Sequence, residues 1–170
     1  RDLLGSISSL PGRAVILTGI RRCGKSTLLK QLMHKLKCYN YFNFEDNRAA
    51  GFEVEDFTKF DDIFKNNKKL LLFFDEIQNI DKWELYIRTL LDKKYSIFIT
   101  GSNATLMSRE LGTKLTGRHL KYELFPFSYE EFLKFKKLND NKKNFIKYFN
   151  NGGFPEYLQK YEKQVLQTLF

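Results

Sequence analysis

A glycine-bounded loop between two apolar segments is the feature that most limits how this chain can fold. Residues 19–26 read Gly-Ile-Arg-Arg-Cys-Gly-Lys-Ser, which satisfies the pattern G-x-x-x-x-G-K-[ST]. The apolar run Val15–Thr18 precedes the loop, and Lys25 begins a segment in which leucine and methionine recur at helical spacing as far as Leu36. The sequence therefore predicts a strand, a tight loop and a helix in succession.

The residue types in this loop suit a phosphate group. Glycines let the backbone fold closely around an anion, and successive N–H groups at the start of a helix donate to it. Lys25 is predicted to reach the β- and γ-phosphates of a nucleotide, and the Ser26 hydroxyl to ligate Mg²⁺. The predicted ligands are therefore ATP and Mg²⁺. A glycine-rich turn without a ligand is the alternative, and the flanking strand and helix count against it.

Beyond the loop, apolar segments of strand length alternate with segments of helical periodicity. This alternation is typical of a parallel sheet with right-handed crossovers and helices on both faces. We therefore predict an α/β, three-layer P-loop NTPase core with a five-stranded parallel sheet, with the continuously apolar Leu70–Phe74 as its central strand. The predicted strands are Val15–Thr18, Tyr39–Phe44, Leu70–Phe74, Tyr95–Thr100 and Leu120–Phe125.

Helix ends are indicated by capping residues and glycines. Asp81 and Glu84 form a D-x-x-E pattern ahead of an amphipathic segment that extends to about Lys93. A shorter helix, Ala104–Leu111, is expected to end at Gly112.

The character of the chain changes after Phe127. Ser128 and Glu131 predict a capped helix start, and the remainder is helical in pattern apart from Gly152 and Gly153. We expect residues 1–127 to form the α/β core and residues 128–170 to form the start of a helical lid, incomplete in a fragment of a longer protein.

Two acidic residues, Asp75 and Glu76, directly follow the apolar strand Leu70–Phe74. Ligands of open α/β sheets bind at the carboxyl ends of the strands, so this position favours a functional role. Asp75 is predicted to hold Mg²⁺ directly or through water, because this hard cation prefers oxygen ligands. Glu76 is predicted to polarise the water that attacks the γ-phosphate. An ordinary polar turn is the alternative, which the neighbouring phosphate loop makes the less favoured one.

Small polar residues, Thr100–Asn103, follow the next strand. Ser102 is the candidate for sensing the γ-phosphate or orienting water, with Asn103 as its alternative. An N-cap for the following helix explains these residues equally well, and both roles can hold together.

Arginines near these motifs are further candidates. Arg118 follows Gly117 and could neutralise charge on a transferring phosphoryl group, in cis or from a neighbouring subunit. A surface arginine paired with an acid is an equally good interpretation. Arg21 and Arg22 lie within the loop, where variable positions often face solvent.

The composition limits the partners and the cellular location that we expect for this protein. The chain has 29 basic and 20 acidic residues, a net charge of +9 that permits nucleic acid as a partner and equally fits a lysine-rich solvated surface. No apolar run approaches the roughly 20 residues that span a bilayer, so no membrane partner is expected. Cys23 and Cys38 provide no disulfide framework, which favours the cytoplasm, and with His34 and His119 they lack zinc spacing.

Several further strings, taken in order, resemble one family: G-I-R-R-C-G-K-S-T-L-L, L-L-L-F-F-D-E-I-Q, I-T-G-S-N, T-G-R, L-F-P-F-S-Y-E-E-F and G-G-F-P-E-Y-L. They are similar to those of prokaryotic AAA-type ATPases of the AAA+ class and its STAND-like relatives, and the similarity covers nearly the whole chain. The resemblance implies an AAA+-like core and a nucleotide loop that includes Gly19, Ile20, Cys23, Gly24 and Thr27 beside the residues already named.

The same resemblance assigns roles elsewhere. It implies Asp75 for Mg²⁺, Glu76 as the catalytic acid, Ser102 as sensor 1 and Arg118 as an arginine finger. Pro155 resembles the glycine-proline motif that approaches the nucleotide base in STAND-like lids, although a proline in the first helical turn explains it equally well. Members usually continue into a carboxyl-terminal domain of unknown role, through which a homo-oligomer or a protein partner is expected.

The function predicted from these residues is Mg²⁺-dependent hydrolysis of ATP to ADP and phosphate, used as a nucleotide-driven switch. One alternative is a nucleotide-gated module that binds nucleic acid. Another is a P-loop small-molecule kinase, which the Asp75–Glu76 pair disfavours.

Overall fold

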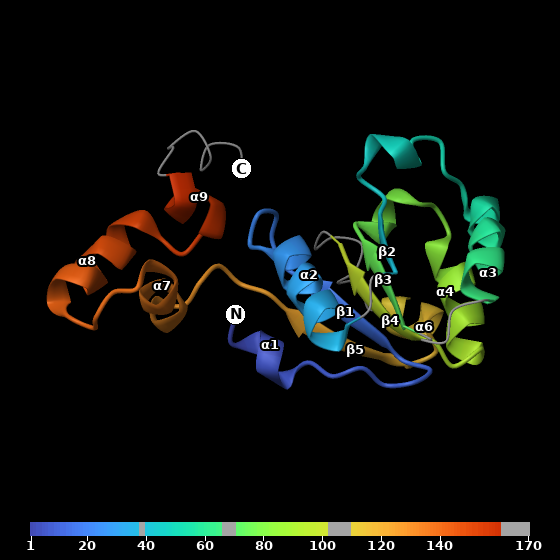
Figure 1. The fold of residues 1–170 in the computed structure, drawn as a ribbon, viewed down its shortest axis with the longest axis horizontal. Helices are drawn as coiled ribbons and strands as arrows, with labels where there is room; N and C mark the ends of the chain where they lie inside the picture. Colours follow the sequence, from blue (N-terminus) through green and yellow to red (C-terminus); the bar gives the residue numbers. More distant parts are fainter. Residues whose placement is uncertain (38–39, 66–70, 102–109, 161–170) are drawn as a thin grey trace.

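The structure is a computed structural model that describes residues 1–37, 40–65, 71–101 and 110–160. Figure 1 shows a twisted sheet with helices on both sides and a further group of helices, residues 129–160, beyond one end of it.

Five parallel strands form one sheet in the order β2-β3-β4-β1-β5. Ile16 of β1, for example, lies opposite Ile99 of β4 on one side and Lys121 of β5 on the other. The strands are β1 Ala14–Thr18, β2 Tyr41–Asn43, β3 Leu71–Asp75, β4 Ser96–Thr100 and β5 His119–Glu123. The predicted α/β fold with a five-stranded parallel sheet is confirmed.

The central strand is β4, so the prediction that Leu70–Phe74 occupies the centre is wrong. The strand β3 is nevertheless interior, with residues 72–75 buried. An unbroken apolar run is needed by any strand covered on both faces, so it does not distinguish the middle strand from its neighbours.

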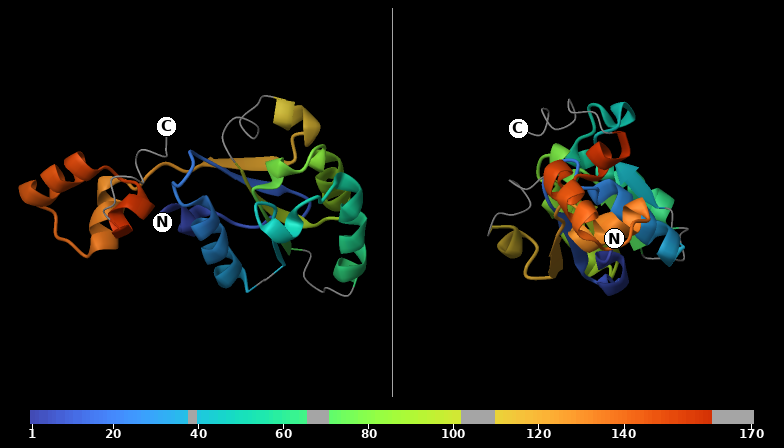
Figure 2. Two further views of the ribbon diagram at one scale, coloured as in Figure 1. Left: turned by 90° about the horizontal axis from the view of Figure 1, so that it is seen from above. Right: turned by 90° about the vertical axis from the view of Figure 1, so that its left-hand side faces the viewer.

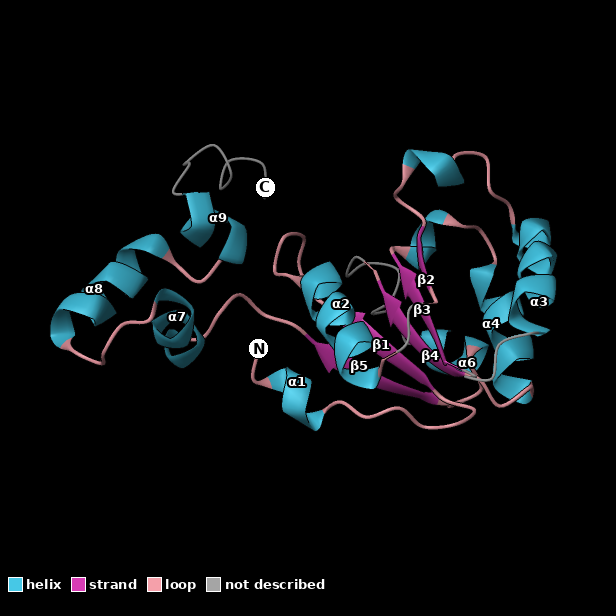
Figure 3. Cartoon of the chain, viewed as in Figure 1, coloured by secondary structure: helices cyan, strands magenta, loops and turns pink. Residues whose placement is uncertain are grey.

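Alternate residues of the strands pack into two cores, one on each face of the sheet. Ile16, Phe74 and Ile99 belong to the core that includes helices α3 and α4, whereas Val15 and Phe98 belong to the core that includes α2. Figure 3 shows these helices on opposite sides of the strands, which makes three layers. The helices are α1 Leu3–Ser6, α2 Lys25–Leu36, the 3-10 helix η2 Val54–Phe57, α3 Thr58–Lys65 and α4 Trp83–Asp92.

The start of α4 differs from the prediction. Its N-cap is Lys82, which has a left-handed backbone with φ of 57°, and no side chain caps the helix. Glu84 pairs instead with Lys114, with 2.6 Å between Oε1 and Nζ. The predicted Asp81–Glu84 cap is therefore wrong, because the left-handed turn at Lys82 separates Asp81 from the first helical residue.

Helix α6 (Glu110–Lys114) continues through Gly112, so Gly112 does not end it as predicted. The chain turns later, where Thr116 and Gly117 both have positive φ and the Gly117 N–H donates to the Gly112 carbonyl at 2.8 Å. The rest of the predicted helix Ala104–Leu111 lies largely outside the described residues.

Three helices follow the sheet: α7 (Tyr129–Lys136), α8 (Lys142–Asn151) and α9 (Pro155–Lys160). The capping box at the start of α7 is confirmed, because Ser128 and Glu131 each accept the other's backbone N–H at 3.2 Å. None of the helices in the described ranges is long and apolar enough to cross a membrane.

The connecting segment around Phe127 packs against the end of this helical region. The Phe127 N–H donates to the Gly153 carbonyl at 2.7 Å, and the Tyr148 hydroxyl donates to the Phe127 carbonyl at 2.8 Å. A side chain at Gly153 would meet the Phe127 carbonyl at 2.2 Å, so only glycine fits. Figure 2 shows the helices extending away from the sheet with the amino terminus beside them. A domain boundary at residue 127 stays a prediction.

Candidate nucleotide site

The glycine-bounded loop lies between the carboxyl end of β1 and the start of α2. Gly19 has φ of 146°, and a Cβ there would lie 2.2 Å from the Leu124 carbonyl oxygen, so the loop passes too close to the chain after β5 for any other residue. Gly24 precedes α2 with φ of 97°, a left-handed conformation that glycine adopts without strain. These two glycines therefore have the structural roles that the motif requires.

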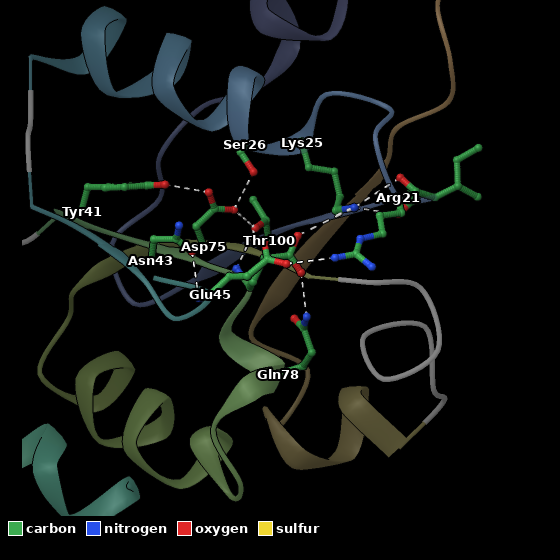
Figure 4. Close-up of polar contacts among 12 residues, drawn as sticks. Arg21, Lys25, Ser26, Tyr41, Asn43, Glu45, Asp75, Gln78 and Thr100 are labelled. Carbon is green, nitrogen blue, oxygen red and sulfur yellow. Dashed lines mark hydrogen bonds and ion pairs between the residues drawn. The ribbon is translucent and has the colours of Figure 1, made fainter. Parts of the chain in front are cut away.

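Lys25 begins α2, and its side chain turns back under the loop (Figure 4). The ammonium group donates to the carbonyl oxygens of Gly19 at 3.0 Å and Ile20 at 3.3 Å, and lies 4.0 Å from Glu76 Oε1. Only 5% of the residue is exposed. The cation is thus held within the loop by neutral carbonyls, a position from which it can reach an anion in the adjacent cavity.

Asp75 ends β3 as a nearly sealed carboxylate, 2% exposed. Its Oδ1 accepts hydrogen bonds from Ser26 Oγ at 3.1 Å and from the Thr100 hydroxyl, and its Oδ2 accepts one from the Tyr41 hydroxyl at 2.7 Å. Burial raises the pKa of Tyr41, and the bond to Asp75 raises it further, so the phenol remains a donor. Three hydroxyls on three elements therefore orient this carboxylate (Figure 4).

Two of these hydroxyls were not among the predicted site residues. Tyr41 belongs to a strand rich in aromatic residues, where packing alone accounts for the presence of a tyrosine. Thr100 is the last residue of β4 and was grouped with the small polar residues that follow. A polar residue at the end of the strand adjacent to β3 was the available signal for Thr100, whereas Tyr41 gave none.

The donor set at this place fits Mg²⁺. Ser26 and Asp75 supply a hydroxyl and a carboxylate oxygen 3.1 Å apart, both of the hard oxygen type that Mg²⁺ selects. Within the described residues, no group of three or more His, Cys, Asp or Glu side chains is arranged to hold a metal ion. A small donor set of this kind suits an ion that keeps several waters and shares the phosphates of its nucleotide.

Glu76 follows with a left-handed backbone, φ 53°, which turns its side chain away from that of Asp75. Its N–H donates to Thr100 Oγ1 at 3.1 Å, and its Oε2 accepts from Gln78 Nε2 at 2.6 Å. The two adjacent carboxylates therefore have separate surroundings, one among hydroxyls and the other between Lys25 and Gln78.

A cavity of about 450 Å³ lies between the loop and Glu76. The polar side chains that line this cavity suit a phosphate chain with a metal ion, since Lys25 and Ser26 lie there beside Glu76. The lining residues are Arg21, Arg22, Gly24, Lys25, Ser26, Thr27, Glu45, Glu76, Gln78 and Asn79.

The variable loop residues have different surroundings. Arg21 pairs with Glu45 at 3.1 Å on the exposed rim, and Arg22 lies 3.6 Å from Glu156 of α9. Ile20 is 42% exposed, whereas Cys23 packs fully into the α2 core, where burial raises the pKa of its thiol. Cys23 and Ile20 thus contribute to the loop through their backbones.

A second cavity of about 320 Å³ lies on the other side of Gly24 and Thr27. The Pro155 Cγ is within 3.8 Å of where a Cβ on Gly24 would stand, so α9 approaches the loop here. The wall of this second cavity includes Arg1. The Arg1 guanidinium lies 4.2 Å from the centre of the Phe127 ring and donates a hydrogen bond to the Cys23 carbonyl. The structure therefore brings the predicted Pro155 to the same loop as Lys25 and Ser26.

Arg118 lies elsewhere. It precedes β5 at the amino edge of the sheet, where its carbonyl accepts from Ala14 at the start of β1, whereas the loop follows the carboxyl end of β1. Its guanidinium pairs with Asp92 at 2.7 Å and donates to Thr116. Arg118 is thus not brought to the cavity of its own chain. Ser102 and Asn103 lie outside the described residues.

Comparison with known proteins agrees with this architecture. A family model described as AAA domain matches residues 11–133, and the chain belongs to that family. An uncharacterised protein of Methanocaldococcus jannaschii is 39% identical over 92% of this chain and 38% of its own length, and one of Haemophilus influenzae is 32% identical over 82% and 39%. The chain thus spans less than two fifths of these relatives.

Similar solved structures include a DNA polymerase III gamma subunit-related protein of Thermotoga maritima, with a TM-score of 0.49 and 10% identity over 84% of this chain and 46% of that chain. Another is PCH-2 of C. elegans, with a TM-score of 0.47 and 14% identity over 78% and 42%. The family match, together with the sheet and the loop, defines an AAA-type P-loop domain of the nucleotide-binding class.

Proposed function

We propose that this domain binds ATP with Mg²⁺ in the cavity beside the glycine-bounded loop, hydrolyses it to ADP and phosphate, and uses the cycle as a conformational switch. The observation that carries the proposal is that Lys25, Ser26 and Glu76 line one cavity of about 450 Å³, with Asp75 bonded to Ser26 behind its wall. Each group has a separate part in phosphoryl transfer to water.

The binding step follows from the loop. Backbone N–H groups at the start of α2 would donate to the β-phosphate, and Lys25 would exchange its carbonyl partners for phosphate oxygens. Ser26 and Asp75 would hold the metal ion. Mg²⁺, when bound, neutralises charge on the phosphate oxygens and orients the terminal phosphate.

The chemical step belongs to Glu76. Its carboxylate lies at the cavity wall, 4.0 Å from Lys25, and would accept a proton from a water positioned in line with the γ-phosphate. The separate environment of Asp75, with three hydroxyl donors, lets one carboxylate bind metal while the other activates water.

The nucleoside end of ATP fits the second cavity. That space lies between the loop and the lid, and Phe127 and Pro155 offer apolar surface to a base. Arg22 of the loop also faces Glu156 of α9. Loss of the γ-phosphate would therefore alter contacts between the loop and the helices α7–α9, which is the basis for proposing a switch.

Equilibrium binding with a fluorescent ATP analogue, with and without Mg²⁺, tests this assignment. Lys25→Ala should abolish binding, and Asp75→Asn should remove the dependence on Mg²⁺ while leaving metal-free binding. Lys114→Ala, which removes a cation that pairs with Glu84 and does not line the cavity, is the matched control and should bind as the unaltered chain does. Equal binding by Lys25→Ala would contradict the proposed site.

A further inference from the structure

Gln78 makes a contact with Glu76 that the proposed reaction has not used. It lies in the 3-10 helix η3 (Ile77–Asn79), directly after the left-handed turn at Glu76, and its side chain lines the same cavity as Lys25. Gln78 Nε2 donates to Glu76 Oε2 at 2.6 Å (Figure 4). The amide therefore fixes one oxygen of the carboxylate that faces the phosphate loop.

The other Glu76 oxygen is not held in this way. Lys25 Nζ lies 4.0 Å from Oε1, which is beyond hydrogen-bond reach, and Lys25 is already bonded to two loop carbonyls. Oε1 is consequently the atom left to accept a proton while Oε2 stays bonded to the amide.

We propose that Gln78 is a positioning residue in the ATPase reaction that acts through Glu76, an inference that rests on the proposed function. Its Nε2 holds Oε2 of Glu76, so that Oε1 of the same carboxylate is presented to the attacking water and takes a proton from it. The water O–H bond breaks as its oxygen bonds to the γ-phosphorus. The bond from that phosphorus to the bridging oxygen breaks, and ADP leaves with the electron pair.

The test is a double-mutant cycle between Gln78→Leu and Glu76→Gln, followed by free phosphate release. Gln78→Leu retains the size of the side chain without its hydrogen bonds, and should lower kcat by about tenfold or more with KM changed less than twofold. In the Glu76→Gln background the same substitution should have almost no further effect, because Gln78 acts through the Glu76 carboxylate. Gln78→Glu, which also loses the donor, should reproduce the loss if Gln78→Leu folds poorly.

Asn47→Leu is the control for replacing an amide by an apolar group, since Asn47 is exposed in the 3-10 helix η1 (Asn47–Ala49), and it should leave kcat unchanged. Full activity in Gln78→Leu, or a loss that is additive with Glu76→Gln, overturns the role of Gln78 while leaving the ATPase intact. If the unaltered chain releases no more phosphate than Glu76→Gln, the proposed function fails and the role of Gln78 fails with it.

Discussion

At the scale of single residues, three hydroxyl groups surround the buried carboxylate of Asp75, the proposed metal ligand. A buried charge is unfavourable unless it is hydrogen-bonded, and three hydroxyls from α2, β2 and β4 supply those bonds. Tyr41 is the donor on Oδ2, so it determines which way the second oxygen faces.

Removing the Tyr41 hydroxyl should affect both metal use and stability. Tyr41→Phe is expected to raise the Mg²⁺ concentration that half-saturates ATP hydrolysis and to lower the free energy of unfolding by about 1 kcal/mol. Tyr122→Phe is the matched control, because Tyr122 packs on the same core and its hydroxyl bonds to no residue within the described ranges. An unchanged Mg²⁺ dependence in Tyr41→Phe would show that the phenol does not orient Asp75.

His119, the first residue of β5, is expected to make the free energy of unfolding depend on pH. Burial lowers its pKa below the ordinary value of 6.5, and the nearby charge of Lys121 lowers it further. His119 therefore takes up a proton less readily in the folded state than in the unfolded state. As the pH falls below 6.5 the unfolded state binds this proton first, so the free energy of unfolding decreases until the pH passes the lower pKa of the folded state. Chemical denaturation at pH 7 and pH 5 should show a larger loss for the unaltered chain than for His119→Asn. Equal losses would mean that His119 makes no such contribution.

The grouping of site residues was predictable from the sequence only where a motif fixes their positions. Lys25, Ser26, Asp75 and Glu76 were singled out because of their spacing and their place after strands; the structure places Lys25, Ser26 and Glu76 around one cavity and bonds Asp75 to Ser26, while their roles stay predictions. Tyr41 and Gln78 were not singled out, because an aromatic in a strand and a glutamine in a turn have ordinary explanations, and their contacts depend on tertiary structure.

At the scale of elements, Glu131 in the first turn of α7 takes part in both a helix cap and an ion pair. Glu131 closes the capping box with Ser128, and it also pairs with Arg1 at 2.9 Å, where the arginine side chain is 6% exposed. The Asp2 N–H donates to the same carboxylate at 3.1 Å. The amino-terminal segment is thus joined to helix α7 at the wall of the second cavity.

Because Glu131 makes both contacts, replacing it should lower the free energy of unfolding more than replacing Ser128. Ser128→Ala should lower the free energy of unfolding by about 1 kcal/mol, the usual cost of a lost cap. Glu131→Ala should cost at least about 2 kcal/mol more, because it also leaves the buried Arg1 guanidinium without its carboxylate. Urea denaturation of both variants measures the difference, and equal costs would mean that the Arg1 pair contributes nothing.

Elements were predicted well where a local signal sets them. The helix Lys25–Leu36 and the Ser128–Glu131 cap were placed correctly from periodicity and capping residues. The start of α4 and the end of α6 were not, because left-handed backbone at Lys82 and Thr116 is imposed by the surrounding fold on residues that do not favour it. The sheet order also depends on contacts far apart in sequence.

At the scale of the whole molecule, the position of Arg118 determines how the site can be completed. It lies at the sheet edge opposite the loop and is paired with Asp92, so within one chain it cannot reach the phosphates. An arginine finger at this position would have to act on the site of a neighbouring copy.

This geometry predicts that activity depends on assembly if Arg118 is catalytic. Phosphate released per chain should then rise with protein concentration, and Arg118→Ala should reduce the activity at high concentration at least about tenfold. Arg88→Ala, which replaces an exposed arginine of α4 that does not line the cavity, serves as the control. Activity that is independent of concentration and unaffected by Arg118→Ala would restrict Arg118 to its structural pair with Asp92.

The most direct test of the central claim is free phosphate release from ATP with Mg²⁺ by the unaltered chain and by Glu76→Gln. Glu84→Gln is the matched control, since Glu84 pairs with Lys114 and does not line the cavity. We expect phosphate release by the unaltered chain and by Glu84→Gln, and a loss of about a hundredfold or more in Glu76→Gln with ATP binding retained. Equal release by all three chains would contradict the assignment of ATP hydrolysis to this site.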